Sequence, residues 1–145
     1  MLLTGLLHPG VLGALAGAGH GARVLIADGH YPASTAVGER AGTVHLNLTP
    51  GLLDVTTVLD ALLPVLPVES AWVMTPPEGT PEPPAIAAYR SRLAHVPVET
   101  LGRFDFYDAA RSPDLALTIV TADVRTYANL LLVIGVRPEG TLTPP

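Results

Sequence analysis

Short apolar runs, interrupted by glycine and proline, divide the chain into alternating candidate strands and helices. Continuous runs rich in Val, Ile and Leu predict buried strands, and apolar residues at three- and four-residue intervals predict helices. The strands are predicted at 24–27, 44–48, 71–74, 96–101, 115–120 and 130–134. The helices are predicted from Pro9 to a stop at Gly17 or Gly19, at 49–63, at 86–93, and as a short helix within 103–111. The strand at 44–48 is inferred from alternation of apolar and polar residues rather than from a continuous run.

The alternation of strand and helix favours one α/β domain over residues 1–145. Strands that are short, continuous and apolar are typical of a largely parallel sheet with helices on both faces, a three-layer sandwich. Thr49-Pro50 has the form of a helix start, a capping hydroxyl followed by proline in the first turn. The segment 76–84 contains five prolines and is expected to be a loop.

Composition adds an expectation about assembly and location. Charged residues make up 14% of the 145 residues, against about 25% in an average protein, so part of the surface is expected to be covered by other subunits. A net charge of −5 offers no electrostatic footprint for nucleic acid. No apolar run approaches the roughly 18 residues of a membrane span. The apolar N-terminus has no basic residue before Arg23, which argues against a signal peptide, and a cytoplasmic protein is expected.

Two residue types are absent, and their absence limits the chemistry. The chain has no cysteine, which excludes thiolate nucleophiles, disulfides and cysteine-ligated metals. All eight basic residues are arginine, so Schiff-base catalysis and a P-loop lysine are excluded as well. No Gly-x-Ser-x-Gly nucleophile motif occurs.

Candidate chemistry gathers around the first predicted strand. His20 lies between two glycines before the strand, and Asp28 and His30 follow its carboxyl end, where α/β sheets bind ligands. Two simpler interpretations remain open, His20 as a surface histidine and Asp28 as a turn residue. His20, Asp28 and His30 are also a conceivable metal-ligand set, without a known spacing. Gly17-x-Gly19-x-x-Ala22 matches the residue pattern of the dinucleotide-binding fingerprint. That fingerprint must follow a strand and begin a helix, whereas this segment follows a predicted helix and precedes a predicted strand.

Four separated motifs, in this order, resemble one known family. They are Gly19-His20-Gly21, Asp28-Gly29-His30-Tyr31-Pro32-Ala33, Arg103-Phe104-Asp105-Phe106-Tyr107 and Tyr127-Ala128-Asn129-Leu130-Leu131-Leu132. Together they are similar to the D-ribose pyranase/L-fucose mutarotase family over almost the whole chain. The resemblance implies a sugar mutarotase that binds a free monosaccharide and needs neither a cofactor nor a metal. That no nucleic-acid or membrane partner is expected follows from the composition instead. The resemblance also implies a homo-oligomeric ring, often a decamer, with sites at subunit boundaries.

The resemblance also assigns roles to residues. By matching position it implies His20 as the catalytic acid and base, which suits a side chain that titrates near neutrality. The implied sugar-binding residues are Asp28, Arg103, Tyr127, Ala128 and Asn129. No role follows for His30 or Tyr107.

The expected substrate is L-fucose or a related 6-deoxyhexose, because Arg-Phe-x-Phe-Tyr at 103–107 resembles the fucose branch. Ala128 resembles the ribose branch, and residues 44–47 depart from the usual loop of the fucose branch. A ribose pyranase, or a sugar-binding protein without turnover, is therefore the alternative.

Overall fold

Ten regular elements alternate along the chain in the computed structural model, which describes residues 2–140. The helices are α1 (Pro9–Gly17), α2 (Val55–Leu62), α3 (Pro84–Arg92) and α4 (Arg103–Ala110). The strands are β1 (Arg23–Ala27), β2 (Gly42–His45), β3 (Val68–Met74), β4 (Val98–Leu101), β5 (Leu115–Val120) and β6 (Leu130–Ile134). Each expected element is present, and those at 115–120 and 130–134 have the predicted bounds. None of the helices described within 2–140 is long and apolar enough to span a membrane.

All six strands form one sheet in the order β2-β5-β1-β6-β3-β4. β1 pairs in parallel with β5, β5 with β2, and β3 with β4. β6 lies between β1 and β3 and is antiparallel to both, so five strands run one way and β6 runs the other. The expectation of an α/β fold with a largely parallel sheet is therefore confirmed.

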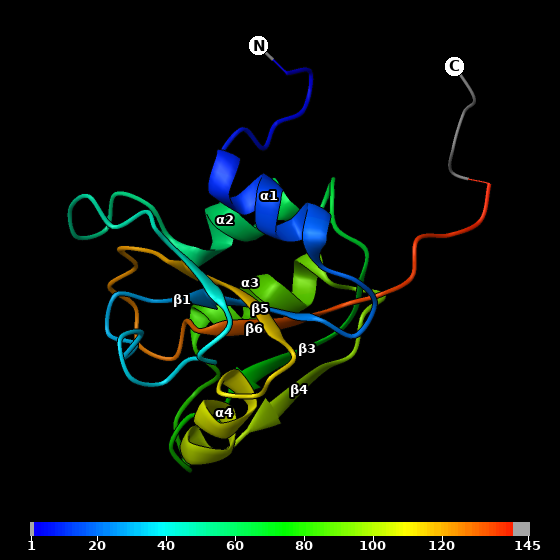
Figure 1. The fold of residues 1–145 in the computed structure, drawn as a ribbon. Coiled ribbons are helices and arrows are strands. Elements are labelled where there is room, and N and C mark those ends of the chain that lie inside the picture. Colours follow the sequence, from blue (N-terminus) through cyan, green and yellow to red (C-terminus); the bar gives the residue numbers. More distant parts are fainter. Residues whose placement is uncertain (1, 141–145) are drawn as a thin grey trace.

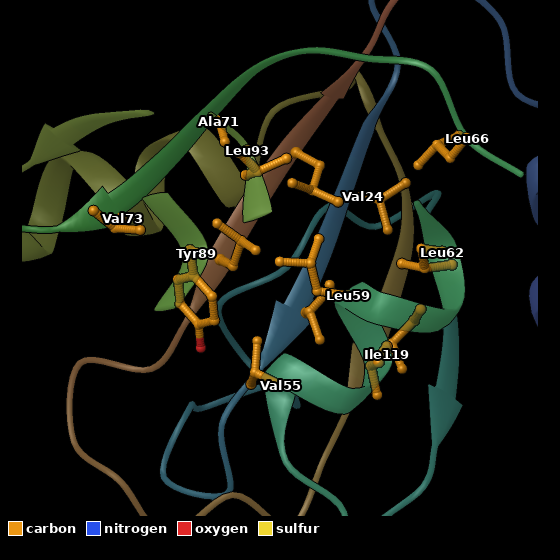
Figure 2. Packing of buried hydrophobic residues seen from close by; sticks show 14 of the residues in the cluster. Val24, Val55, Leu59, Leu62, Leu66, Ala71, Val73, Tyr89, Leu93 and Ile119 are labelled. Atoms are coloured by element: carbon orange, nitrogen blue, oxygen red, sulfur yellow. The ribbon is translucent and has the colours of Figure 1, made fainter. Parts of the chain in front are cut away.

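Helices cover both faces of the sheet, with α1, α2 and α3 on one side and α4 on the other (Figure 1). Alternate residues of each strand face opposite sides, so Val24 and Ile26 pack in the larger core while Leu25 and Ala27 pack in the smaller one. Figure 2 shows the larger core, where Leu59 lies near Val24 and Ile119. The smaller core contains Phe106 of α4. The three layers agree with the expected sandwich.

The expected helix start at Thr49-Pro50 is wrong. Residues 49–52 form a turn in which Gly51 has a φ of 75°, a left-handed conformation that favours glycine, and its N–H donates to the Ala122 carbonyl at 2.7 Å. The helix begins only after Asp54, whose carboxylate accepts a hydrogen bond from the Thr57 N–H at 2.7 Å. Leu52, expected on the buried face, is 61% exposed. A contact with a distant loop thus overrides the local capping signal.

The strand expected at 44–48 is also shifted. β2 ends at His45, and Leu48 is 84% exposed rather than alternating into the core. The Leu46 N–H still donates to the Val120 carbonyl, but β5 ends at Val120 and provides no further partner strand. The alternation of apolar and polar residues therefore extends to Leu48, although the strand itself ends at His45.

We expect Asp54→Ala to lower the free energy of unfolding by about 1 kcal/mol, because it removes the cap of α2. Asp54→Asn should retain most of that stability, since asparagine caps as well as aspartate, and it separates the cap from the 3.3 Å ion pair of Asp54 with Arg125. Thr49→Ala should change stability by less than about 0.5 kcal/mol. Urea unfolding followed by circular dichroism measures all three. Equal losses for Thr49→Ala and Asp54→Ala would contradict the observed start.

Candidate functional site

Asp28 and Asn129 form a reciprocal pair at the carboxyl end of β1. The Asp28 N–H donates to Asn129 Oδ1 at 2.8 Å, and Asn129 Nδ2 donates to Asp28 Oδ2 at 2.8 Å. The two residues are only 2% and 4% exposed. They meet because β6 runs antiparallel to β1, which places the start of β6 beside the end of β1, with Ile26 opposite Leu130. Residues 101 positions apart in sequence thus share one polar site.

Burial changes the protonation chemistry of Asp28. Desolvation raises the pKa of its carboxyl group, and backbone hydrogen bonds from His30 and Ala128 offset part of that effect. The His30 N–H donates to Asp28 Oδ1 at 3.0 Å. A carboxylate has about four acceptor positions on its two oxygens, so capacity remains for hydroxyl groups of a ligand. Asp28 is therefore a preoriented acceptor in an environment of low polarity.

The segment 127–129 is held in an unusual backbone conformation. Tyr127 has a φ of 58°, the only positive φ of a non-glycine residue in the described part of the chain. The buried Tyr89 hydroxyl donates to the Ala128 carbonyl at 2.7 Å. Burial raises the pKa of Tyr89, so this hydroxyl stays protonated and able to donate. The contact fixes the turn from which Tyr127 and Asn129 project.

Arg103 approaches the same edge from the start of α4. Its Nε donates to the Tyr107 hydroxyl at 3.1 Å, and its guanidinium lies 5.5 Å from the centre of the Tyr107 ring. The Tyr107 ring meets the Tyr31 ring edge to face at 5.4 Å, and Tyr31 lies three residues after Asp28. The Tyr107 hydroxyl raises the pKa of Arg103, with a smaller contribution from Tyr127. Arg103 and Tyr127 are thus within electrostatic reach of each other.

A cavity of about 250 Å³ lies beside this polar edge, next to the carboxyl ends of β1 and β5. Its lining includes His30, Asn47, Thr49, Thr121 and Val124. The His30 Nε2 is 3.2 Å from the Val124 carbonyl oxygen. The volume is below the roughly 300–1,000 Å³ of drug-sized sites, so the cavity suits only a small molecule. His30 therefore borders the site, and its backbone binds Asp28 while its ring binds the neighbouring loop.

A second buried carboxylate, Asp123, anchors the loop that leads into 127–129. Its oxygens accept from Arg125 Nη2 at 2.6 Å, from Arg125 Nε at 2.9 Å and from the Val55 N–H at 3.0 Å. Desolvation acts to raise the pKa of Asp123, but the hydrogen bonds from Arg125 and Val55 together outweigh it and lower the pKa. This network ties the start of α2 to the loop before β6.

His20 lies at the other end of the sheet. It precedes β1 whereas Asp28 follows it, and the neighbouring Gly21 N–H donates to the carbonyl of Ile134, the last residue of β6. The five residues of β1, at about 3.3 Å each, separate the two ends by roughly 16 Å. The His20 side chain is 60% exposed, and its Nε2 lies 2.8 Å from Glu69 Oε2. One chain thus brings together Asp28, Asn129, Tyr127 and Arg103, but not His20.

This separation also bears on the metal alternative. His20 cannot reach an ion held by Asp28 and His30 of the same chain. Within residues 2–140, no group of three or more His, Cys, Asp or Glu side chains has a geometry that could hold a metal ion.

Several residues of the site carried no recognisable sequence signal. Tyr89 is a polar residue on the otherwise apolar buried face of α3, and that position is its only signal. Asp123 and Arg125 are two apart in a loop, a spacing without special meaning. Glu69 is a charged residue in an apolar strand, and its partner is 49 positions away. Each of these residues is assigned to the site by a hydrogen bond that only the three-dimensional structure shows.

The fold and the site together define a class of protein. An α/β domain that gathers a carboxylate, an amide, a phenol and a guanidinium at the carboxyl edge of its sheet suits a small ligand rich in hydroxyl groups.

The chain matches the model of the RbsD / FucU transport protein family over residues 1–137 and belongs to that family. The resemblance inferred from the four motifs is thereby confirmed. The chain is 31% identical over 144 residues to the fucose mutarotase of Bos taurus, with 90% of each protein covered.

Solved structures share the fold. RbsD of Bacillus subtilis, solved with D-ribose, has a TM-score of 0.83 at 23% identity and covers 95% of this chain and 100% of its own. FucU of Bifidobacterium longum has a TM-score of 0.79 at 28% identity, covering 93% and 100%. The fucose mutarotase of Streptococcus pneumoniae, solved with L-fucose, has a TM-score of 0.77 at 23% identity, covering 90% and 94%.

The Asp123 network predicts a specific dependence of stability on pH. Because folding lowers the pKa of Asp123, its contribution is complete above the unfolded value of 3.8 and is lost as the pH falls through the folded value. Asp123→Asn should therefore cost about 2 kcal/mol at neutral pH, and the difference from the unmodified protein should shrink below about pH 4. Urea unfolding at a series of pH values measures this difference.

Asp28 is present in both proteins, so most of its own titration cancels in that comparison. The remainder is the small upward shift that the nearby Asp123 charge adds to the pKa of Asp28. Asp108→Asn is the control, because Asp108 is 77% exposed and pairs with Arg111 at the surface; its effect should stay within about 0.5 kcal/mol. A cost for Asp123→Asn that is the same from neutral to acidic pH would contradict the assignment.

Proposed function

We propose that this protein is a sugar mutarotase, an isomerase that interconverts the anomers of a free monosaccharide. Membership of the RbsD / FucU family and the similarity to a fucose mutarotase support this activity. The structural observation that carries it is the reciprocal Asp28–Asn129 pair, flanked by Tyr127 and Arg103. We propose L-fucose or a related 6-deoxyhexose as the substrate, with D-ribose as the second candidate.

The reaction needs proton transfer and little else. Opening the cyclic hemiacetal removes a proton from the anomeric hydroxyl, breaks the bond between C1 and the ring oxygen, and adds a proton to that oxygen. The aldehyde then turns, and reclosure on its other face reverses the transfers, so no net proton is consumed. Asp28 accepts hydrogen bonds from sugar hydroxyls, and Arg103 and Asn129 donate them. These contacts hold the sugar while the ring opens.

His20 is the residue proposed to move the proton, and it has to come from another subunit. A histidine exchanges protons readily near neutral pH. In one chain the length of β1 keeps it about 16 Å from Asp28. A sugar bound by Asp28 and Asn129 can therefore reach only the His20 of a neighbouring copy. The proposed site is complete only where two subunits meet.

The two ends of the sheet have surfaces that suit such a contact. Beside His20 lies a groove of about 360 Å³ lined by apolar residues that include Leu12, Leu15 and Val65. At the Asp28 end, Leu48 and Val124 are 84% and 57% exposed. Contact between different surfaces of identical copies closes into a ring when the rotation permits. We propose a homo-oligomeric ring of this kind, with a decamer as the expected size.

Saturation-transfer NMR on a panel of free sugars tests the activity. We expect faster exchange between anomers of L-fucose or of D-ribose than in buffer alone. His20→Ala should remove most of this acceleration, because positioned acid–base catalysis contributes about 10²–10⁴-fold. His95→Ala is the matched control and should exchange at the unmodified rate, since His95 is an exposed histidine outside the site. Unaccelerated exchange of every sugar would overturn the proposal, and calorimetric sugar binding without exchange would indicate a binding protein.

Mixed oligomers test whether the site is shared between subunits. His20→Ala and Asp28→Ala proteins should each be inactive alone. When they are dissociated, mixed in equal amounts and reassembled, about one quarter of the sites should receive an intact His20 from one chain and an intact Asp28 from the next. Exchange should return to about that fraction of the unmodified rate.

The control for this experiment is each variant taken through the same dissociation alone, which should remain inactive. Light scattering after size-exclusion chromatography verifies reassembly and counts the subunits. A reassembled mixture as inactive as its components would place the whole site within one chain, against the proposal.

A further inference from the structure

The imidazole of His20 is held by a carboxylate from a different strand. Glu69 lies at the second position of β3, and its Oε2 is 2.8 Å from His20 Nε2. The Glu69 side chain is 42% exposed and that of His20 is 60% exposed, and His20 lines the groove beside α1. An ionised carboxylate can accept hydrogen bonds but cannot donate them. In this contact the proton is therefore on the Nε2 of His20.

The end of β6 brings the two residues together. β6 lies between β1 and β3, and the Gly21 N–H donates to the Ile134 carbonyl while the Gly135 N–H donates to the Pro67 carbonyl at 2.8 Å. A Cβ atom at Gly135 would lie 3.1 Å from the Glu69 Cβ and 3.3 Å from its backbone nitrogen, which is closer than ordinary contact. The missing side chain at Gly135 thus lets Glu69 sit against β6.

We propose that Glu69 is the positioning residue of His20, and this inference rests on the proposed function. By accepting a hydrogen bond from Nε2–H, the carboxylate fixes the ring orientation and the tautomer. Nδ1 is then the nitrogen that faces the sugar. A carboxylate behind a histidine has this effect because only one ring nitrogen of a neutral imidazole carries a proton.

The proton transfers remain balanced with this assignment. Neutral His20 takes the proton of the anomeric hydroxyl at Nδ1 and becomes an imidazolium that Glu69 stabilises. As the C1–oxygen bond breaks, Nδ1 returns the proton to the ring oxygen. Reclosure on the other face of the aldehyde repeats both transfers in reverse. Glu69 never touches the sugar and keeps its own protonation state throughout.

Kinetics of three variants test the role. Glu69→Ala should lower kcat by about 10- to 100-fold with little change in KM, the size of effect seen when a carboxylate that orients a metal-ligating histidine is lost. Glu69→Gln should lie between Glu69→Ala and the unmodified protein, because the amide can present either its oxygen or its NH₂ group to Nε2. Glu78→Gln is the matched control, since Glu78 is an exposed glutamate in the loop before α3, and it should leave the rate unchanged.

A spectroscopic readout tests the same role without activity. In ¹⁵N-labelled protein at about pH 8, where histidines are ordinarily neutral, long-range ¹H–¹⁵N spectra distinguish the two tautomers. Among the signals of the five histidines, those of His20 are the ones missing from the His20→Gln spectrum. We expect His20 to carry its proton on Nε2 in the unmodified protein and to show a mixture in Glu69→Ala.

The outcomes separate this inference from the proposed function. Failure of the unmodified protein to exchange any sugar overturns the mutarotase, while the tautomer still tests the Glu69 contact. A Glu69→Ala protein with the unmodified rate and an unmodified His20 spectrum overturns the positioning role and leaves the mutarotase intact. If circular dichroism shows that Glu69→Ala does not fold, the tautomer of His20 in the unmodified protein decides. A His20 proton on Nδ1 there overturns the inference.

Discussion

The antiparallel pairing of β6 with both β1 and β3 is the constraint on which the rest of the molecule depends. At one end of β6, Asn129 is brought against Asp28. At the other end, Ile134 and Gly135 draw the His20 turn and the start of β3 together, so that Glu69 meets His20. A parallel β6 would have placed Asn129 at the His20 end. One reversed strand therefore determines which functional groups share each end of the sheet.

Buried polar groups keep the Asp28 end of the sheet in one conformation. Asp28, Asn129 and Asp123 are almost fully buried, and each has hydrogen-bond partners, because an unsatisfied buried polar group costs about 1–3 kcal/mol. Such a network penalises alternative arrangements of the 127–129 loop. The same burial raises the pKa of Asp28, where desolvation dominates, and leaves that of Asp123 lowered, where Arg125 is close enough to compensate. The pKa values of these two aspartates at one edge of the sheet are thus shifted in opposite directions.

Elements within a single hydrophobic pattern were predictable, and boundaries set by distant contacts were not. β5 and β6 are continuous apolar runs, and burial on both faces leaves no other assignment for them. The start of α2 was misassigned because Thr49-Pro50 has the local form of a cap. The Gly51 N–H instead binds the Ala122 carbonyl, and Asp54 caps the helix. A local motif cannot report a hydrogen bond to a residue some 70 positions away in sequence.

The same division applies to the site. The type of chemistry followed from the sequence: the absence of lysine and cysteine excluded whole classes of catalysis, and four ordered motifs indicated the family. Asp28 and Asn129 could be expected to belong together, but Tyr89 and Glu69 could not, because each acts through one nonlocal contact. The sequence already places His20 before β1 and Asp28 after it, and an extended strand keeps its two ends apart. The tertiary structure alone decided that Asn129 joins Asp28 at one end while Glu69 joins His20 at the other. The physical reason is that the direction of β6 between β1 and β3 is set by nonlocal strand pairing, which no local pattern encodes.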